Sequence, residues 1–205
     1  MPPVPTPIAP QAPRSVGDAV MDLVLSIPAS AESLAESPAT RAHVVARTAA
    51  RRASMLSGSM ALPPGVLGWL TVLPELMGVW RLQAQMVSDI AAVYGQHHNL
   101  GREHMLYCLF KHVSAQLLRD VVVRVGQRTV VKPMTVKALQ SLAQQLGVQV
   151  TKAMLGKSAS RLVPLLGAVG VGAYAYFDTM QVAKTAVALF EQATIIDSQN
   201  EAKSP

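Results

Sequence analysis

Apolar residues recur at helical spacing along most of the chain, so the sequence predicts a series of amphipathic helices. The clearest pattern runs from Glu75 to Tyr94, where apolar residues share one face and Arg81, Gln85 and Asp89 share the other. The expected fold class is therefore all-α, a helical bundle. The predicted helices are Ser15–Ser26, Pro38–Ala53, Glu75–Tyr94, Arg102–Arg128, Thr135–Gly156 and Ser160–Phe190.

Two apolar segments without charged residues interrupt this amphipathic pattern. The first, Ala53–Pro74, has the length of a bilayer-crossing helix, but prolines and a glycine break it in the middle. Two half-length helices with a bend, as a re-entrant or a buried hairpin, fit this segment better. The second, Leu162–Phe177, is shorter than a usual span. Bends and close helix packing are expected at Pro63, Pro64, Gly65, Gly68, Gly167, Gly170 and Gly172.

The composition is apolar and short of charge. Half of the residues are hydrophobic and 15% are charged, against roughly a quarter charged in an average soluble domain. This deficit predicts a lipid or protein partner. The single cysteine, Cys108, rules out an intramolecular disulfide and suits a reducing compartment.

The first residues, 1–14, are rich in proline and lack the charged and apolar runs of a secretory signal. We expect them to form a disordered leader. A single helical domain is expected over residues 15–195, with a frayed tail over 196–205.

Positive charge is concentrated in one part of the chain. The net charge is +6, and the stretch Arg102–Arg161 carries an excess of lysine and arginine over Glu103 and Asp120. Such a block favours phosphate-bearing partners, although an ordinary solvated helix face remains open. No aromatic stacking surface accompanies it, so a lipid surface is favoured over nucleic acid. The predicted basic helix surface is formed by Arg119, Arg124, Arg128, Lys132 and Lys137.

Sequence motifs for catalysis or nucleotide binding are incomplete. The string GVGAYA at Gly170 matches a dinucleotide pattern but lacks the surrounding strands, and GKSAS at Gly156 lacks the first glycine of a phosphate loop. The acids of the patterned helices do not adjoin a nucleophile. We predict no catalytic residue and no cofactor, and assign a polar helix face to Glu75, Arg81, Gln85, Asp89, Asp178 and Lys184.

His104, Cys108 and His112 share one predicted helix face, four residues apart. Neighbouring pairs could bind one metal ion, but the two histidines are about 12 Å apart along a helix and could not share it. No paired cysteine or HExxH spacing supports a metal. A capping histidine pair and a core thiol are the favoured interpretation, and no metal is predicted.

The string LPPGVLGWLTVLPELMGVWRLQAQMVSDIAAVYG, followed by MLYCLFKH and RLVPLLGAVGVGAYAYFDTMQVAKTA, resembles the EcsC family of bacterial proteins. The likeness covers roughly residues 56–190 and leaves out the leader and the first helices. It implies a helical, membrane-associated protein without an agreed biochemical activity; the family takes its name from a component encoded with an ABC-type transporter. It supplies no catalytic residues for this chain.

Three functional hypotheses follow. The first is a peripheral or shallowly inserted protein on the cytoplasmic side of the inner membrane, which binds anionic lipid or a transporter-type membrane protein. The second is a soluble helical scaffold that docks an acidic partner. The third is an unrecognised enzyme or metal protein that uses Glu75, Asp89 and Asp178, or His104 and Cys108. We expect no nucleic-acid partner, and the sequence identifies no small-molecule substrate.

Overall fold

The structure is a computed structural model, and it describes residues 15–60, 68–125, 128–156 and 164–201, with side chains in 15–58, 76–123, 129–152 and 170–195. Within these ranges the fold is all-α, as predicted, with one short hairpin of two antiparallel strands. The α-helices are α1 (Val16–Leu25), α2 (Pro38–Met60), α3 (Gly68–Val93), α4 (Arg102–Phe110), α5 (Val136–Gly156) and α6 (Pro164–Glu201). The hairpin is formed by β1 (Val122–Val125) and β2 (Arg128–Val131), and short 3-10 turns cover His97–Asn99 and Arg119–Val121.

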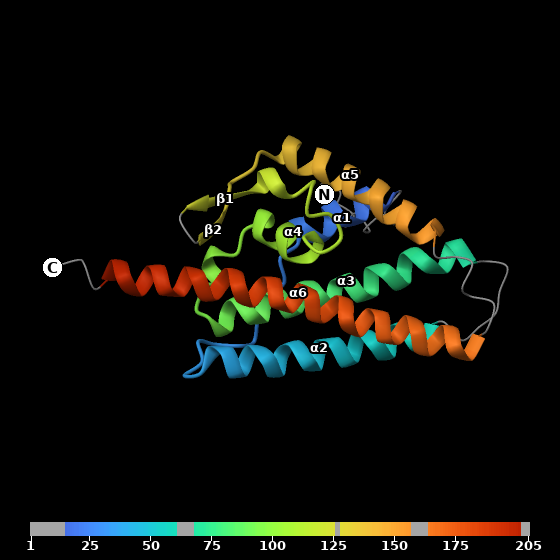
Figure 1. The fold of residues 1–205 in the computed structure, drawn as a ribbon, viewed down its shortest axis with the longest axis horizontal. Coiled ribbons are helices and arrows are strands. Elements are labelled where there is room, and N and C mark those ends of the chain that lie inside the picture. Colours follow the sequence, from blue (N-terminus) through green and yellow to red (C-terminus); the bar gives the residue numbers. More distant parts are fainter. Residues whose placement is uncertain (1–14, 61–67, 126–127, 157–163, 202–205) are drawn as a thin grey trace, which may run out of the picture.

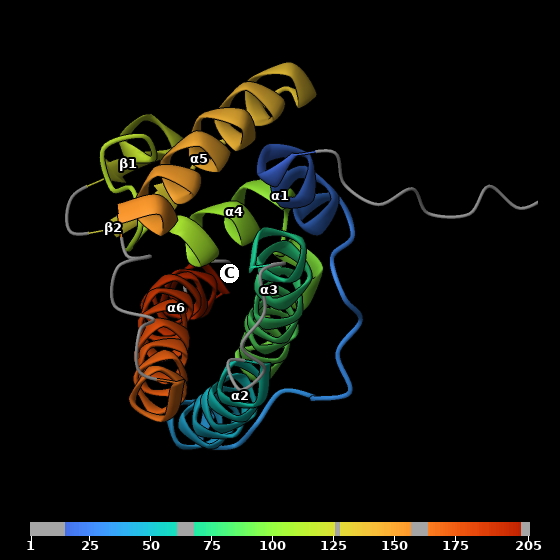
Figure 2. The same cartoon turned by 90° about the vertical axis from the view of Figure 1, so that its right-hand side faces the viewer.

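The helices form two layers (Figure 1). The long helices α2, α3 and α6 pack against one another as a three-helix bundle, which Figure 2 shows from one end. The shorter helices α1, α4 and α5, with the hairpin, cover one side of this bundle. Helix α4 lies between the layers, and it contacts α1, α3, α6 and β2.

The core is centred on α4. Its residues from Met105 to Phe110 are all buried, although they include Tyr107 and Cys108. The ring of Phe110 meets Trp80 of α3 edge to face, with 5.2 Å between the ring centres. Because apolar residues surround α4 on all sides, an amphipathic pattern is not needed there.

Helices α1 and α5 cross at a pair of glycines. A Cβ atom on Gly147 would lie 2.5 Å from the backbone nitrogen of Gly17 and 2.8 Å from its Cα atom. Only glycine at position 147 allows the two backbones to approach so closely. On the same contact, Gln144 Nε2 donates a hydrogen bond to Asp18 Oδ1 at 3.0 Å.

Several predicted helix ends are confirmed. Helix α1 begins after Ser15, whose side chain accepts a hydrogen bond from the Asp18 backbone N–H at 3.1 Å. Thr135 caps α5 in the same way through the Ala138 N–H. Gly95, just past α3, has a φ of 71°, which is the left-handed conformation that glycine adopts most easily.

The predicted helix over Arg102–Arg128 is wrong. Helix α4 ends at Phe110, and the chain then passes through the 3-10 turn Arg119–Val121 into the hairpin. Within the hairpin Val122 pairs with Val131 and Arg124 with Thr129. Valine and threonine prefer strands because their branched side chains are restricted in a helix, and this preference prevails over the helical periodicity of the apolar residues.

The first apolar segment extends two helices. Helix α2 continues beyond the predicted end at Ala53 to Met60, and α3 begins at Gly68 rather than at Glu75. The predicted bend at Pro63, Pro64 and Gly65 lies outside the described residues. The second apolar segment forms the start of α6, which continues without a break to Glu201.

Candidate functional site

Both apolar segments lead to the same end of the molecule. Figure 1 shows the last turns of α2 and α5 and the first turns of α3 and α6 together at its right-hand side. We call this region the apolar end. The hairpin and the last turns of α6 lie at the opposite side of the same view.

Large apolar side chains are exposed on the helices that lead to the apolar end. Met55 of α2 is 73% exposed, and Tyr174 and Phe177 of α6 are 57% and 68% exposed. Val148 of α5 is 54% exposed. Single exposed apolar residues are ordinary, but exposure on three helices that run to one end of a molecule suits contact with a partner.

An open groove of about 820 Å³ lies between α2 and α3. Two arginines contribute to its lining, Arg52 from α2 and Arg81 from α3, and both are exposed. Met55, Leu56 and Leu82 supply apolar walls, while Gly78 and Gln85 complete the lining. The groove therefore combines positive charge with apolar surface.

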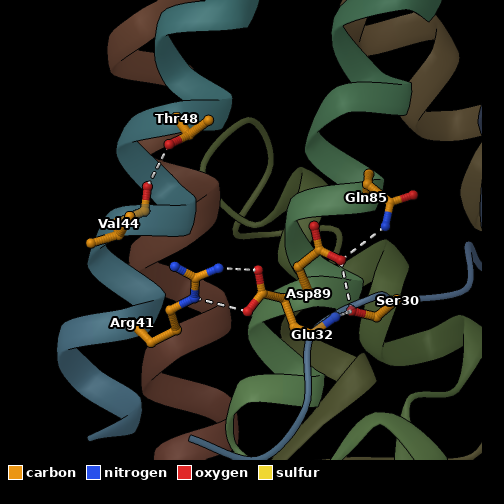
Figure 3. A network of polar contacts seen from close by, with 7 residues as sticks. All are labelled: Ser30, Glu32, Arg41, Val44, Thr48, Gln85 and Asp89. Carbon is orange, nitrogen blue, oxygen red and sulfur yellow. Dashed lines mark hydrogen bonds and ion pairs between the residues drawn. The ribbon is translucent and has the colours of Figure 1, made fainter.

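A polar network lies at the Gln85 side of the groove (Figure 3). Gln85 Nε2 donates to the Ala29 carbonyl and to Asp89 Oδ1, both at 2.9 Å. Ser30 donates to the same Asp89 oxygen at 2.7 Å. These bonds attach the extended segment 27–37 to α3.

The extended segment is also attached to α2. Arg41 donates two hydrogen bonds to Glu32, from Nε at 2.8 Å and from Nη2 at 2.6 Å. These bonds from Arg41 lower the pKa of the Glu32 carboxyl. Arg41 is thus engaged within the protein, and it differs in this respect from the arginines of the groove.

A second polar cluster joins α3, α6 and the end of α4. Gln83 Nε2 donates to Asp178 Oδ2 at 2.7 Å and to Thr179 Oγ1 at 3.2 Å. His112 Nε2 lies 2.7 Å from the other Asp178 oxygen. The His112 and Asp178 side chains are 19% and 14% exposed to solvent, so this cluster is a partly shielded link between helices.

The histidines and the cysteine do not form one centre. In the parts of the chain that the structure describes, no group of three metal-ligand side chains gathers. His104 Nδ1 accepts a hydrogen bond from the Gly101 N–H at 3.1 Å, and burial lowers its pKa. Burial raises the pKa of the Cys108 thiol to about 12, which keeps it protonated and unreactive.

A serine–histidine contact occurs between α3 and the following turn, with His97 Nε2 3.0 Å from Ser88 Oγ. The Ser88 hydroxyl donates to the Pro28 carbonyl at 2.6 Å, and its side chain is fully buried. A substrate could not reach this hydroxyl, so the contact holds the extended segment in place rather than forming a nucleophile.

The predicted glycines differ in their surroundings. A Cβ on Gly172 would lie 3.0 Å from the Ser54 carbonyl oxygen of α2, so α2 and α6 approach closely there. A Cβ on Gly170 would meet no atom within 4 Å. Gly68 begins α3 and Gly167 lies in the first turns of α6.

The predicted basic surface lies on the hairpin and its flanks rather than on a helix. Arg119 is in the 3-10 turn, Arg124 in β1 and Arg128 in β2. Lys132 follows β2, and Lys137 is in the first turn of α5; both are exposed. Figure 1 places the hairpin away from the apolar end, so these residues do not flank the apolar segments.

The predicted polar helix face is divided among separate places. Arg81 and Gln85 line the groove, whereas Asp178 belongs to the cluster with Gln83 and His112. Asp89 joins the network of Figure 3, and Lys184 is exposed on α6. Glu75 lies in α3, and its side chain is outside the described side chains.

Sequence reasoning missed two features of these sites. It did not single out Gln83 of α3, although the side-chain amide of this buried residue donates a hydrogen bond to Asp178. It also left Met55 and Arg52 apart from Arg81, because two neighbouring helices must be docked before their side chains share a groove. No local pattern in the sequence indicates that α2 and α3 pack side by side.

Comparison of the chain with protein-family profiles, with curated proteins and with solved structures finds no match. Among the described residues, no helix combines the length and the apolar character that crossing a bilayer requires.

Proposed function

We propose that this protein is a non-enzymatic, peripheral membrane protein that binds an anionic lipid surface through its apolar end. The observation that carries the proposal is the convergence of both apolar segments at one end, with exposed Met55 and Phe177 on the helices that lead there. Arg51 and Arg52 lie on α2 beside Met55 in the sequence and are exposed. Apolar side chains and arginines together suit the boundary between headgroups and acyl chains.

The proposed location is the cytoplasmic side of the inner membrane, where anionic headgroups would attract the arginines. Each basic residue near such a surface contributes about 1 kcal/mol. A transporter-type membrane protein is an alternative partner at the same end. The resemblance of the sequence to EcsC proteins also supports membrane association.

The test is sedimentation with vesicles of phosphatidylglycerol and phosphatidylcholine. We expect the protein to pellet with mixed vesicles, less so with phosphatidylcholine alone, and less again at high salt. The double variant Met55→Ser/Phe177→Ser should remain in the supernatant. The matched control is Leu34→Ser, because Leu34 is 67% exposed but lies on the extended segment near the far end of α3. A wild-type protein that never pellets with anionic vesicles would refute the proposal.

A second candidate function is docking of an acidic partner at the hairpin. It is favoured by the placement of Arg119, Arg124, Arg128 and Lys132 around β1 and β2, away from the apolar end. A soluble scaffold would use this surface. The variant Arg124→Glu/Arg128→Glu distinguishes the two functions, because it should leave vesicle binding unchanged.

A further inference from the structure

The groove between α2 and α3 has the size of a ligand site and the lining of an amphiphile site. Its volume of about 820 Å³ falls within the range of roughly 300–1,000 Å³ typical of small-molecule pockets. A Cβ on Gly78 would lie 2.9 Å from Leu56 Cδ2, so the glycine makes room for Leu56 to lie over α3. The apolar lining of the groove is therefore continuous from α2 to α3 where Leu56 lies over Gly78.

The two arginines of the groove are available for a ligand. Within the described part of the chain, the ion pairs are Arg41–Glu32 and His112–Asp178, and neither Arg52 nor Arg81 takes part in one. Among acids with described side chains, the nearest in sequence to Arg81 is Asp89, which instead accepts hydrogen bonds from Ser30 and Gln85. Two guanidinium groups on facing helices thus present positive charge without a carboxylate partner among those residues.

The ligand chemistry follows from this combination. A guanidinium group matches the oxygens of a phosphate, to which it can donate two hydrogen bonds at once. A free phosphate ion would leave Met55, Leu56 and Leu82 unused, whereas a phosphodiester with an acyl chain uses both parts of the lining. Met55 and Leu56 lie nearer the last turn of α2 than Arg52 does, so a chain that leaves the arginines along these residues is directed toward the apolar end.

We propose that the α2–α3 groove binds a single anionic phospholipid, with its phosphate between Arg52 and Arg81 and its acyl chain along Met55 and Leu82. This inference rests on the proposed membrane association and deepens it, because it adds a stoichiometric site to a surface interaction. The headgroup is recognised in the groove, and the rest of the lipid stays with the bilayer.

The experiment uses dihexanoyl-phosphatidylglycerol below its micelle concentration, titrated by calorimetry into the whole protein. We expect saturable binding at one site, weakened by at least about tenfold in Arg52→Gln/Arg81→Gln because charge-assisted hydrogen bonds are lost. The matched control, Arg47→Gln/Lys184→Gln, removes two exposed charges that do not line the groove and should bind as the wild type does.

A second measurement needs no variant. With methionine methyl groups labelled for NMR, the Met55 signal should shift during the titration, whereas that of Met105, which is fully buried in the core, should not. Equal binding by the Arg52→Gln/Arg81→Gln variant, or a Met55 signal that stays in place, overturns the inference. Displacement of the lipid by equimolar inorganic phosphate also overturns it, in favour of a free-phosphate site.

Sedimentation separates this inference from the broader proposal. If the wild type pellets with anionic vesicles but does not bind the short-chain lipid, the groove site is wrong and the membrane association stands. If the wild type does not pellet, the proposed function itself fails.

Discussion

The glycine crossing of α1 and α5 gives a sharp prediction for the substitution Gly147→Ala. The added Cβ would lie 2.5 Å and 2.8 Å from the nitrogen and Cα atoms of Gly17, and 3.2 Å from the carbonyl carbon of Val16. Ordinary contacts of carbon atoms are about 3.5–4.0 Å. Because all three neighbours are backbone atoms, no rotamer change relieves the overlap, and the two helices must move apart.

The expected magnitude is a balance of two effects. Overpacking of a close contact costs about 1–3 kcal/mol. Alanine is favoured over glycine in a helix by about 1 kcal/mol, which offsets part of that cost. We therefore expect Gly147→Ala to lower the free energy of unfolding by up to about 2 kcal/mol. For a domain of this size that corresponds to a Tm lower by up to about 8 °C.

The assay is thermal and denaturant unfolding followed by circular dichroism, with Gly170→Ala as the control. A Cβ at Gly170 meets no atom within 4 Å, so this variant gains only the helix preference and should be more stable by up to about 1 kcal/mol. Opposite signs for the two variants support the close crossing. A Gly147→Ala protein as stable as Gly170→Ala would refute the reasoning.

Three further outcomes are expected. Cys108 should resist a thiol reagent at pH 8 until the protein unfolds, because it is fully buried and its pKa is raised to about 12; rapid labelling of the native protein would contradict this. His104 has a lowered pKa through burial, so the folded state binds fewer protons than the unfolded state. The contribution of His104 to the free energy of unfolding should thus be fully present above the unfolded pKa of about 6.5, and it should fall as the pH drops toward the lower pKa of the folded state. Unfolding curves of His104→Gln should lack this part of the pH dependence. Phe110→Ala should cost about 3–5 kcal/mol in denaturant unfolding, since it empties the contact with Trp80; a loss below 1 kcal/mol would mean that the core collapses around the gap.

The local pattern of the sequence was enough to predict the helices with clear starts and ends. Ser15 and Thr135 act as caps and Gly95 ends α3, and each of these signals depends only on neighbouring residues. The helix predicted through Arg128 failed because the helical periodicity of apolar residues was given more weight than the run of valines at 121–123. Strand preference also depends on pairing with Thr129–Val131, and a helical periodicity contains no information on such pairing.

The candidate site was less accessible to sequence reasoning than the fold. Arg81 and Gln85 were assigned to one polar face, and the structure places both in the groove. Asp89 and Asp178 were grouped by charge alone, yet they bind different partners on different elements. Which charged residues share a site depends on the docking of helices that are far apart in the chain, and periodicity within one helix carries no information about it.

The order of the helices has a consequence for biosynthesis. Helix α2 packs more extensively against α6 than against any other element, although α3, α4 and α5 lie between them in the chain. On α2, Ala42, Ala46, Ala50 and Ala53 form a buried stripe. A nascent chain that has emerged only as far as α5 has not yet covered α2 with α6. During that interval the alanine stripe is a target for chaperones or for premature association, so slowing translation before α6 should increase aggregation more than slowing it afterwards.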